Sequence, residues 1–486
     1  MAVETQTKAS EAAQEVVVAG AAAEEKEVVK ELPPPPPAPE AEEDPKKHSG
    51  EEAPSLPAIG RAVTFTEESN LVTDLEDPEK KALDEIKQLV QAALANHEFS
   101  PPPPPPPAAE PPIKVEEEAK PEEQPPPAPA TEEPAPPSDI PPPLEEVLIW
   151  GIPLLGDERS ETVLIKFLQA RDLKVKEAMA MLKNAVIWRK EFGIEALVEE
   201  DLGIPEMEKV VFMHGTDRDG HPVCYNVYGE FQNKELYAMA FADEEKRQRF
   251  LRWRIQYLEK GIRQLLDFSP GGVCTMVQVT DLKNSIGPMK RELRQALTLL
   301  QDNYPEFAAK QIFVNVPWWY LAFNRMISPF FTQRSKSKFV FAGPSKTAET
   351  LFKYIAPEQV PVQYGGLSKE NDPEFTAADA VTEITIKPLM KQLIEIPLNE
   401  KCLLVWELRV LGWDVTFGAE FVPSSEDGYT VIVQKARKLV ATDEPVEKNR
   451  FKIGEAGKVV LTVDNTTSKK KKLLYRYKIK SSTVSL

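Results

Sequence analysis

The sequence predicts an α/β domain followed by an all-β domain, both behind a long acidic segment that is too polar to fold. Strand-like and helix-like segments alternate between residues 210 and 368, which favours a mainly parallel sheet. Beyond Thr376, short strand-like segments follow one another with few helical signals, as in a β-sandwich. Residues 1–150 hold 30 of the 46 prolines and a net charge of −22, whereas the whole chain of 486 residues carries −18.

The N-terminal part of the chain divides into a tail, a helix and a linker. Residues 1–76 and 100–143 are predicted to be disordered, because segments so rich in Pro, Glu and Ala bury too little apolar surface to offset chain entropy. Between them, residues 77–99 form a predicted amphipathic helix that starts at Asp77, before Pro78. The helix either docks on the folded domain or stays free to bind a partner. Its apolar residues share one face: Leu83, Ile86, Leu89, Val90 and Leu94.

Residues 144–209 are predicted to form a helical lobe, because apolar residues recur there with helical spacing. From about Val210 the period changes to that of strands. Two predicted strands flank the turn TDRDG, and the segments VCTMVQVTDL, QIFVNV and KFVFAG are further strands, each followed by helical sequence. The predicted α/β domain spans residues 210–368.

The segment 318–331 is the most apolar part of this domain. Its aromatic and aliphatic residues cover more than one face of a helix, and such a helix needs apolar neighbours on both sides. One side is therefore expected to meet something other than the sheet, which suggests a cavity for a hydrophobic ligand. Packing on the sheet is the alternative, and it is favoured for Trp318 and Tyr320.

Cysteine usage and hydropathy indicate the compartment. Cys224, Cys274 and Cys402 lie in apolar strand-like runs without a CxxC pair, which is typical of buried free thiols in a reducing compartment. The N-terminus lacks the apolar core of a signal peptide, and no apolar run reaches the roughly 18 residues that a membrane span needs. We therefore expect a protein of the cytoplasm that visits membrane surfaces.

Seven motifs in order resemble the CRAL-TRIO lipid-transfer family across residues 150–368. They are FLQARD, WRKEFG, DRDGHPV, TDLKN, DNYPE, SKSKFVF and APEQVPVQYGG. Residues 375–482, the predicted sandwich, resemble a GOLD domain. This pairing behind an acidic Pro-rich segment is similar to the plant patellins. The resemblance implies a CRAL-TRIO domain with an N-terminal helical lobe and a C-terminal GOLD sandwich.

The resemblance also implies a site for an inositol-phosphate headgroup at Arg171, Glu306, Ser335 and Lys338. Cationic and hydroxyl donors suit a phosphodiester, and a carboxylate accepts hydrogen bonds from inositol hydroxyls. Each residue also has a simpler structural interpretation. Arg171 could be a charge at a helix end, Glu306 a helix cap, and Lys338 a solvated residue at a strand edge. Where the family holds a phosphatidylcholine headgroup with hydroxyl residues, this chain has Met276 and Gln278, so a lipid of another class is expected there.

A gate helix is implied at residues 323–331, with side chains that would cover the acyl chains of a lipid or enter the bilayer. These gate residues are Phe323, Met326, Ile327, Phe330 and Phe331. Arg334 and Lys336 follow the gate and suit an anionic membrane surface. A second basic cluster is either a solvated loop or another lipid contact. It consists of Lys469, Lys470, Lys471 and Lys472.

The expected function is that of a peripheral membrane protein that binds phosphoinositides and other acidic lipids and transfers or senses one hydrophobic lipid. The resemblance places this activity in membrane trafficking, including cell-plate formation in cytokinesis, at plasma, endosomal or cell-plate membranes. It also implies a protein partner for the GOLD domain. Two alternatives remain: a carrier of a non-phospholipid ligand, and a trafficking adaptor without transfer activity.

Catalysis is not expected. The sequence has no GxSxG, P-loop, GxGxxG or HExxH pattern, and beyond residue 150 its histidines are His214 and His221, both beside the TDRDG turn. No cofactor or metal site is therefore predicted. The acidic chain also shows no recognisable nucleic-acid-binding motif.

Overall fold

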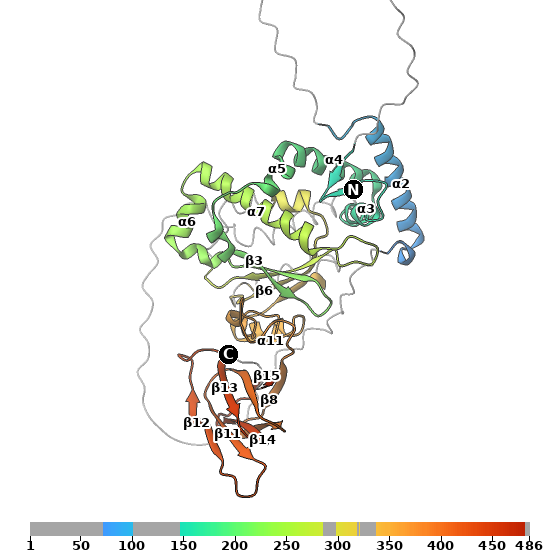
Figure 1. Ribbon diagram of the computed structural model, residues 1–486. Helices are drawn as coiled ribbons and strands as arrows, with labels where there is room; N and C mark the ends of the chain where they lie inside the picture. The colour runs from blue at the N-terminus through green and yellow to red at the C-terminus, as the bar shows by residue number, and fades with distance from the viewer. Residues whose placement is uncertain (1–70, 101–145, 285–297, 318–319, 321–336, 482–486) are drawn as a thin grey trace, which may run out of the picture.

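The computed structural model describes residues 71–100, 146–284, 298–317, 320 and 337–481. They form a helical lobe, a domain built on a five-stranded sheet, and a β-sandwich (Figure 1). The predicted α/β domain followed by an all-β domain is confirmed. Among the described helices, none is both long and apolar enough to cross a membrane. Most of the predicted tail and linker, at residues 1–70 and 101–145, lies outside the described residues.

Helix α2, Asp77–Ala95, packs on the helical lobe. It begins with a capping box between Glu76 and Glu79, and Pro78 lies in its first turn. Leu83 and Ile86 on its apolar face are buried against α3 and α4, so the helix is docked and not free. The other elements of the lobe are β1 Leu148–Ile149, β2 Ile152–Pro153, α3 Ser160–Gln169, α4 Val175–Phe192 and α5 Ile194–Glu199.

The central sheet has the strand order β3-β4-β5-β6-β7. β3 and β4 form the predicted hairpin around TDRDG, and the pairs from β4 to β7 are parallel. The strands are β3 Val211–Thr216, β4 Pro222–Asn226, β5 Met276–Asp281, β6 Ala308–Val314 and β7 Phe339–Phe341. Short 3-10 helices connect parts of the chain: η1 Val72–Asp74, η2 Pro205–Lys209, η3 Tyr228–Gln232, η5 Pro344–Lys346 and η6 Val362–Tyr364.

Helices cover the sheet on both sides. α6, Lys234–Phe241, and α7, Glu244–Leu265, lie on the side of the helical lobe, whereas α11, Thr347–Leu351, lies between the sheet and the sandwich (Figure 1). Asp243 caps α7, because its carboxylate accepts a hydrogen bond from the backbone N–H of Lys246 at 2.8 Å. The apolar stripe of α7 joins the same core as Cys224 and Met276 of the sheet.

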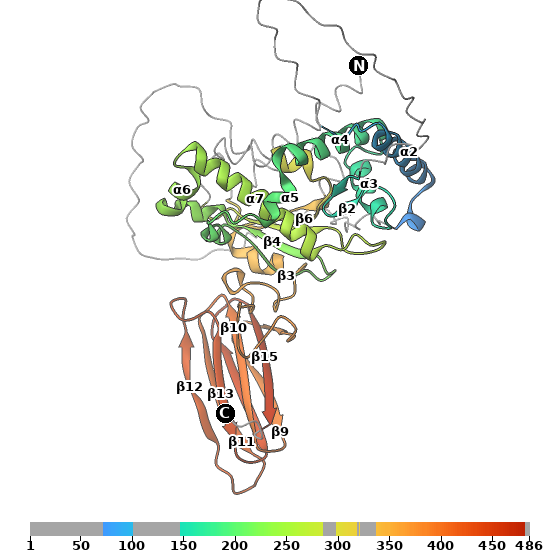
Figure 2. The same cartoon turned by 45° about the horizontal axis from the view of Figure 1, so that its top comes forward.

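The sandwich packs two four-stranded antiparallel sheets around Trp406 and Phe417, which are 1% and 0% exposed. The strand orders are β13-β10-β15-β8 and β12-β11-β14-β9. In Figure 2 the strands extend away from the α/β domain, with β12 and β9 on opposite sides. The strands are β8 Thr382–Ile386, β9 Met390–Leu398, β10 Cys402–Leu411, β11 Val415–Pro423, β12 Val431–Leu439, β13 Glu447–Ile453, β14 Gly457–Asn465 and β15 Lys471–Ser481.

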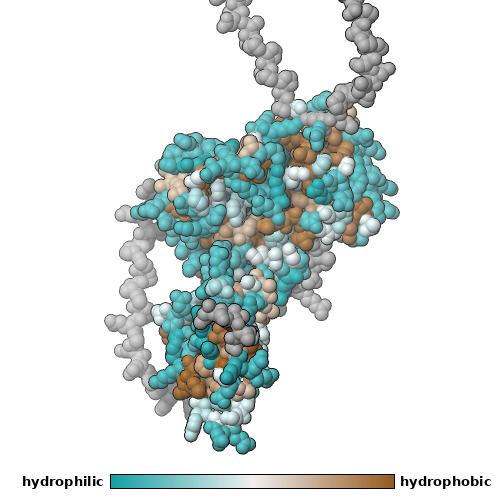
Figure 3. All heavy atoms as spheres, in the orientation of Figure 1, coloured by the Kyte–Doolittle hydropathy of each residue, from teal (hydrophilic) through white to brown (hydrophobic). Residues whose placement is uncertain are grey.

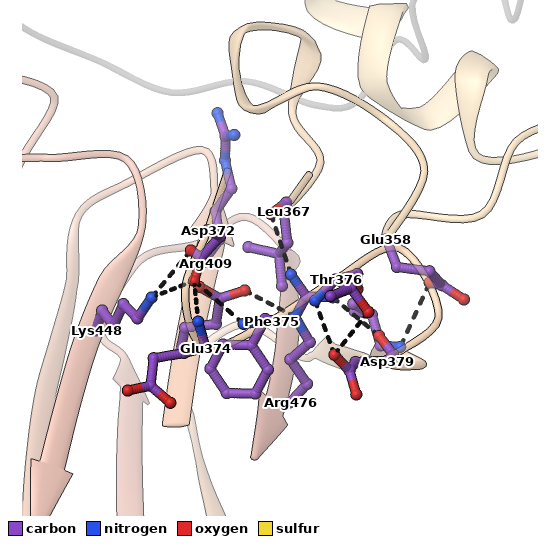
Figure 4. Close-up of polar contacts among 12 residues, drawn as sticks. Glu358, Leu367, Asp372, Glu374, Phe375, Thr376, Asp379, Arg409, Lys448 and Arg476 are labelled. Atoms are coloured by element: carbon purple, nitrogen blue, oxygen red, sulfur yellow. Dashed lines mark hydrogen bonds and ion pairs between the residues drawn. The ribbon is translucent and has the colours of Figure 1, made fainter. Parts of the chain in front are cut away.

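A buried arginine, Arg476 of β15, ties the sandwich to the chain that leads into it from the α/β domain (Figure 4). Its guanidinium donates to Glu407 Oε1 at 2.7 Å and to the backbone oxygens of Thr376 and Leu367 at 2.7 and 3.3 Å. The ring of Phe375 lies 4.8 Å from the guanidinium carbon. These contacts fix the connecting segment against the sandwich.

A second arginine, Arg409 of β10, donates to the backbone oxygens of Val362 and Gly366, the latter at 3.0 Å. Gly366 has to be glycine, because a Cβ there would lie 2.0 Å from the backbone oxygen of Val360. Beside this link, Leu474 of β15 belongs to the same apolar core as the strands β4, β5 and β6. The two domains therefore share a core and are held at a fixed position.

Polar residues cover most of the visible surface (Figure 3). Apolar residues gather over the helical lobe near α3 and α4, and over a smaller area of the sandwich at β12. In the latter area Val431 and Ile432 are 45% and 71% exposed.

Candidate functional site

One face of the central sheet is only partly covered. Along β5, Val277 and Val279 are fully buried on the side of α11, whereas Gln278 and Thr280 point to the opposite side and are half-buried. Residues paired in register point to the same side of a sheet, so this side continues onto β6 and β7. The residues of this half-exposed face are Gln278, Thr280, Gln311, Phe313, Phe339 and Phe341.

Aromatic side chains dominate the β6–β7 part of the half-exposed face. The Phe313 and Phe341 rings stack with centroids 5.1 Å apart, and the Phe313 and Phe339 centroids are 6.1 Å apart. Partly exposed aromatic rings on an interior sheet face are a surface against which hydrophobic ligands pack.

Two of the predicted headgroup residues lie at the edge of this face and pair with each other. Glu306 precedes β6 and Lys338 precedes β7, so the start of two adjacent parallel strands brings them together. Lys338 Nζ donates to Glu306 Oε2 at 2.5 Å, and the two side chains are 18% and 21% exposed. Lys166 Nζ, on the buried side of α3, donates to the backbone oxygen of Glu306 at 2.9 Å and anchors this turn.

Arg171 lies just beyond the end of α3, in the same neighbourhood. Burial raises the pKa of Asp302, and the positive charge of Arg171 counteracts this rise. The short segment from Asp302 to Glu306 thus approaches both Arg171 and Lys338. The fourth headgroup residue, Ser335, lies outside the described residues. So do the gate residues Phe323, Met326, Ile327, Phe330 and Phe331, and the basic residues Arg334 and Lys336.

Sequence reasoning missed a polar cluster at the other end of the half-exposed face, because it did not predict α7. Arg254 of α7 is 6% exposed, and its Nη2 lies 3.5 Å from Asn226 Oδ1. Asn226 Nδ2 donates to Gln278 Oε1 at 2.9 Å, and the Tyr228 hydroxyl donates to Asn226 Oδ1 at 3.4 Å. Burial raises the pKa of the Cys224 thiol to about 11, although the charge of Arg254 opposes this rise.

A second buried arginine, Arg189 of α4, forms an ion-pair network with α7, and of its three nitrogens only Nε lacks a partner. Its Nη1 and Nη2 donate to Glu259 Oε1 and Oε2 at 2.6 and 2.9 Å, and the Tyr304 hydroxyl donates to Glu259 Oε1 at 2.7 Å. Arg263 Nε also contacts Glu259 Oε2, at 3.3 Å. Burial and the Glu259 charge raise the pKa of Tyr304 well above its usual value. This network connects α4 to α7 and has no free donor pair to offer a ligand.

The four lysines of the second basic cluster have different surroundings. Lys471 is 7% exposed and donates to the backbone oxygen of Gly412 at 2.7 Å. Lys472 pairs with Glu383 at 2.7 Å. Lys469 and Lys470, in the loop between β14 and β15, are exposed. Of the predicted membrane-contacting lysines in this cluster, two are therefore available to an external surface.

An exposed apolar turn lies beside these two lysines. Leu389, just before β9, and Met390, the first residue of β9, are 73% and 54% exposed. The backbone N–H of Leu389 donates to the backbone oxygen of Thr467 at 3.2 Å, which holds the two loops together. Leu389 has a φ of 57°, a left-handed conformation that is strained for a residue of its size.

Comparisons with known proteins agree with this architecture. The family models for the "CRAL/TRIO, N-terminal domain", the "CRAL/TRIO domain" and the "Patellin-1-like, C-terminal GOLD domain" match residues 82–184, 206–366 and 387–471. Patellin-3 of Arabidopsis thaliana is 57% identical over 86% of this chain and 78% of its own length. The chain belongs to the patellin family. Patellin-5 of the same plant is 54% identical over 86% of this chain and 56% of its own length.

Membership of the patellin family confirms the predicted CRAL-TRIO domain, helical lobe and GOLD domain. A more distant relative is the phosphatidylinositol transfer protein SFH5 of Meyerozyma guilliermondii, which is 27% identical over 48% of this chain and 72% of its own length. That relative is, by its name, a lipid-transfer protein.

Proposed function

We propose that this patellin binds one lipid against the half-exposed face and transfers or senses it at membranes. The observation that carries the proposal is the Glu306–Lys338 pair, which places a carboxylate and an ammonium group at the edge of the partly buried aromatic face of the sheet. A lipid needs both features, since its acyl chains require apolar contact and its headgroup requires charged partners. The name of the relative SFH5 supports a phosphatidylinositol ligand.

In this proposal the headgroup of a phosphoinositide separates the pair. Lys338 then binds the phosphodiester, together with Arg171 and Ser335, and Glu306 accepts hydrogen bonds from inositol hydroxyls. When no lipid is bound, the two side chains neutralise each other, so the half-buried charges remain satisfied. The gate residues from Phe323 to Phe331 cover the acyl chains, and Arg334 and Lys336 meet the anionic membrane.

The GOLD domain supplies a second membrane contact through the exposed turn. Leu389 and Met390 enter the interface between headgroups and acyl chains, while Lys469 and Lys470 contact anionic headgroups. Because the two domains share a core, this contact holds the CRAL-TRIO domain at a fixed orientation on the membrane. In cells we infer a role in membrane trafficking, including cell-plate formation in cytokinesis, with a protein partner on the GOLD domain.

The test is the transfer of radiolabelled phosphatidylinositol between vesicles, run beside vesicle sedimentation. We expect transfer by the wild-type chain and at least about tenfold slower transfer by the double variant Glu306→Gln/Lys338→Met, since a lost charged hydrogen bond has about this effect. The control is Lys346→Met, which removes a surface lysine paired with Glu349. Sedimentation without transfer would favour sensing, and equal transfer by the double variant would overturn the headgroup site.

A further inference from the structure

We propose that the interior of the α/β domain holds a second polar site, centred on Arg254, that binds the anionic end group of a hydrophobic ligand. The end group is a carboxylate or a phosphate. This inference rests on the proposed function, because it uses the half-exposed face as the wall of a lipid chamber.

The first reason is that Arg254 is a buried charge without a counter-charge. Its side chain is 6% exposed, and Nε and Nη1 have no hydrogen-bond partner. Among the described residues, no carboxylate forms an ion pair with it. A guanidinium stays protonated in proteins, and buried charges are normally paired. An anion that accepts hydrogen bonds from these unpaired donors would supply the missing negative charge.

The second reason is that the neighbouring titratable groups cannot supply the negative charge. Burial raises the pKa of the Cys224 thiol to about 11, so this group is neutral near neutral pH. Burial also raises the pKa of the Tyr228 hydroxyl, although Arg254 counteracts the rise. The other contacts of the cluster, Asn226 and Gln278, are neutral amides. The counter-ion therefore has to come from outside the cluster.

The third reason is that the cluster borders the half-exposed face. Gln278 belongs both to the cluster, through its hydrogen bond with Asn226, and to this face, where it is half-buried. A ligand that lies on the aromatic rings of β6 and β7 can thus reach the arginine past the amide of Gln278. Arginine recognises carboxylate and phosphate oxygens through paired N–H donors, which defines the ligand chemistry.

The Arg254 site is separate from the Glu306–Lys338 pair. Asn226 pairs with Thr280 near the C-terminal ends of β4 and β5, whereas Glu306 precedes β6, whose first residue pairs with Met276 at the start of β5. The two polar sites thus lie at opposite ends of the strands, and each can be changed without altering the other.

The experiment measures binding of a fluorescent fatty acid, cis-parinaric acid, and of its methyl ester to the delipidated full-length chain. The two probes have the same hydrocarbon chain and differ in charge. We expect the acid to bind at least about tenfold more tightly than the ester, as for a hydrogen bond to a charged group. In Arg254→Met the two affinities should become equal through loss of acid binding, with ester binding retained.

Three matched variants isolate the role of Arg254. Arg252→Met removes an exposed arginine of the same helix that pairs with Glu200, and it should keep the preference for the acid. Lys346→Met, which removes a surface lysine paired with Glu349, should keep it as well. Arg254→Lys retains the positive charge but has fewer N–H donors, so it should retain part of the preference for the acid. It provides a second test of the site if circular dichroism shows that Arg254→Met is unfolded.

Competition distinguishes the two sources of an anionic group. Displacement of cis-parinaric acid by oleate in preference to oleoyl-lysophosphatidic acid identifies a carboxylate site, and the reverse order identifies a phosphate site. Equal binding of acid and ester to the wild-type chain, or an unchanged preference in Arg254→Met, would overturn the Arg254 site alone. Failure to bind either probe would overturn the lipid chamber and with it the proposed function.

Discussion

Two buried arginines, Arg189 of α4 and Arg254 of α7, differ in whether a carboxylate balances their charge. Arg189 donates to both oxygens of Glu259, and Tyr304 donates to the same carboxylate. Arg254 has a long contact with Asn226, a contact with the Tyr228 hydroxyl, and two donor nitrogens without partners. We call the first group closed, because the Glu259 carboxylate balances the charge of Arg189 and receives donors from α4, α7 and the chain before β6, although Nε of Arg189 has no partner. The second group is open on the side of the half-exposed face.

This difference distinguishes buried charges that stabilise the fold from buried charges that are available to bind a ligand. Removing one member of a closed buried network leaves the others unpaired, so the free energy of unfolding falls. Removing an open buried charge relieves a desolvation penalty, so the free energy of unfolding of the ligand-free chain rises. The stability of the ligand-free chain should therefore change in opposite directions when the two arginines are replaced.

The largest expected effect is at the closed network. Arg189→Met leaves the fully buried carboxylate of Glu259 without its main partner, and it should lower the free energy of unfolding by about 3–5 kcal/mol. Denaturant unfolding followed by circular dichroism measures this loss. Arg252→Met is the surface control and should change stability by less than about 1 kcal/mol. A loss no greater than that of the control would remove the contrast between the two arginines.

A smaller effect of opposite sign is expected at Arg254. In the delipidated chain, Arg254→Met should raise the free energy of unfolding by about 1–3 kcal/mol, because a buried unsatisfied guanidinium is replaced by an apolar side chain of similar length. Addition of cis-parinaric acid should raise the unfolding temperature of the wild-type chain and leave that of Arg254→Met unchanged. A destabilised variant would show that Arg254 is a structural residue like Arg189.

The smallest change in stability is expected at the surface, where Leu389 has a strained backbone conformation. Leu389→Gly removes the strain of a positive φ and should raise the free energy of unfolding by up to about 1 kcal/mol. It should also weaken sedimentation with vesicles that contain phosphatidylserine. Lys469→Ser/Lys470→Ser should weaken the same binding at low salt and make it less dependent on salt. If neither variant altered sedimentation, the exposed turn would have no part in membrane binding.

The sequence was sufficient to predict the domain order, the hairpin around TDRDG and the all-β C-terminal domain, because periodicity and turn residues are local signals. It also predicted Glu306 and Lys338 as site residues, and the adjacency of parallel strands brings them within 2.5 Å. Their role in headgroup binding stays a prediction. The gate residues cannot be compared with the structure, since they lie outside the described part of the chain.

Other features depend on tertiary contacts and gave no sequence signal. α7 was missed because its many charged residues mask a narrow apolar stripe, and Arg254 is a charged residue on the buried side of that helix. Likewise, the run from Lys469 to Lys472 is uniform in sequence. In the structure, however, Lys471 donates to the backbone oxygen of Gly412 and Lys472 pairs with Glu383. The partners of a charged residue are often distant in the sequence, so they can be identified only from the folded structure. The signal that was available for α7 is Asp243 before a run with apolar residues at helical spacing.

The most direct test is native mass spectrometry of the full-length chain after incubation with vesicles that contain phosphatidylinositol. We predict that the wild-type chain gains the mass of one phosphatidylinositol molecule and that Glu306→Gln/Lys338→Met does not, while Lys346→Met behaves as wild type. A wild-type chain that acquires no lipid, or a double variant that acquires the same lipid to the same extent, would contradict a lipid chamber closed by this charged pair.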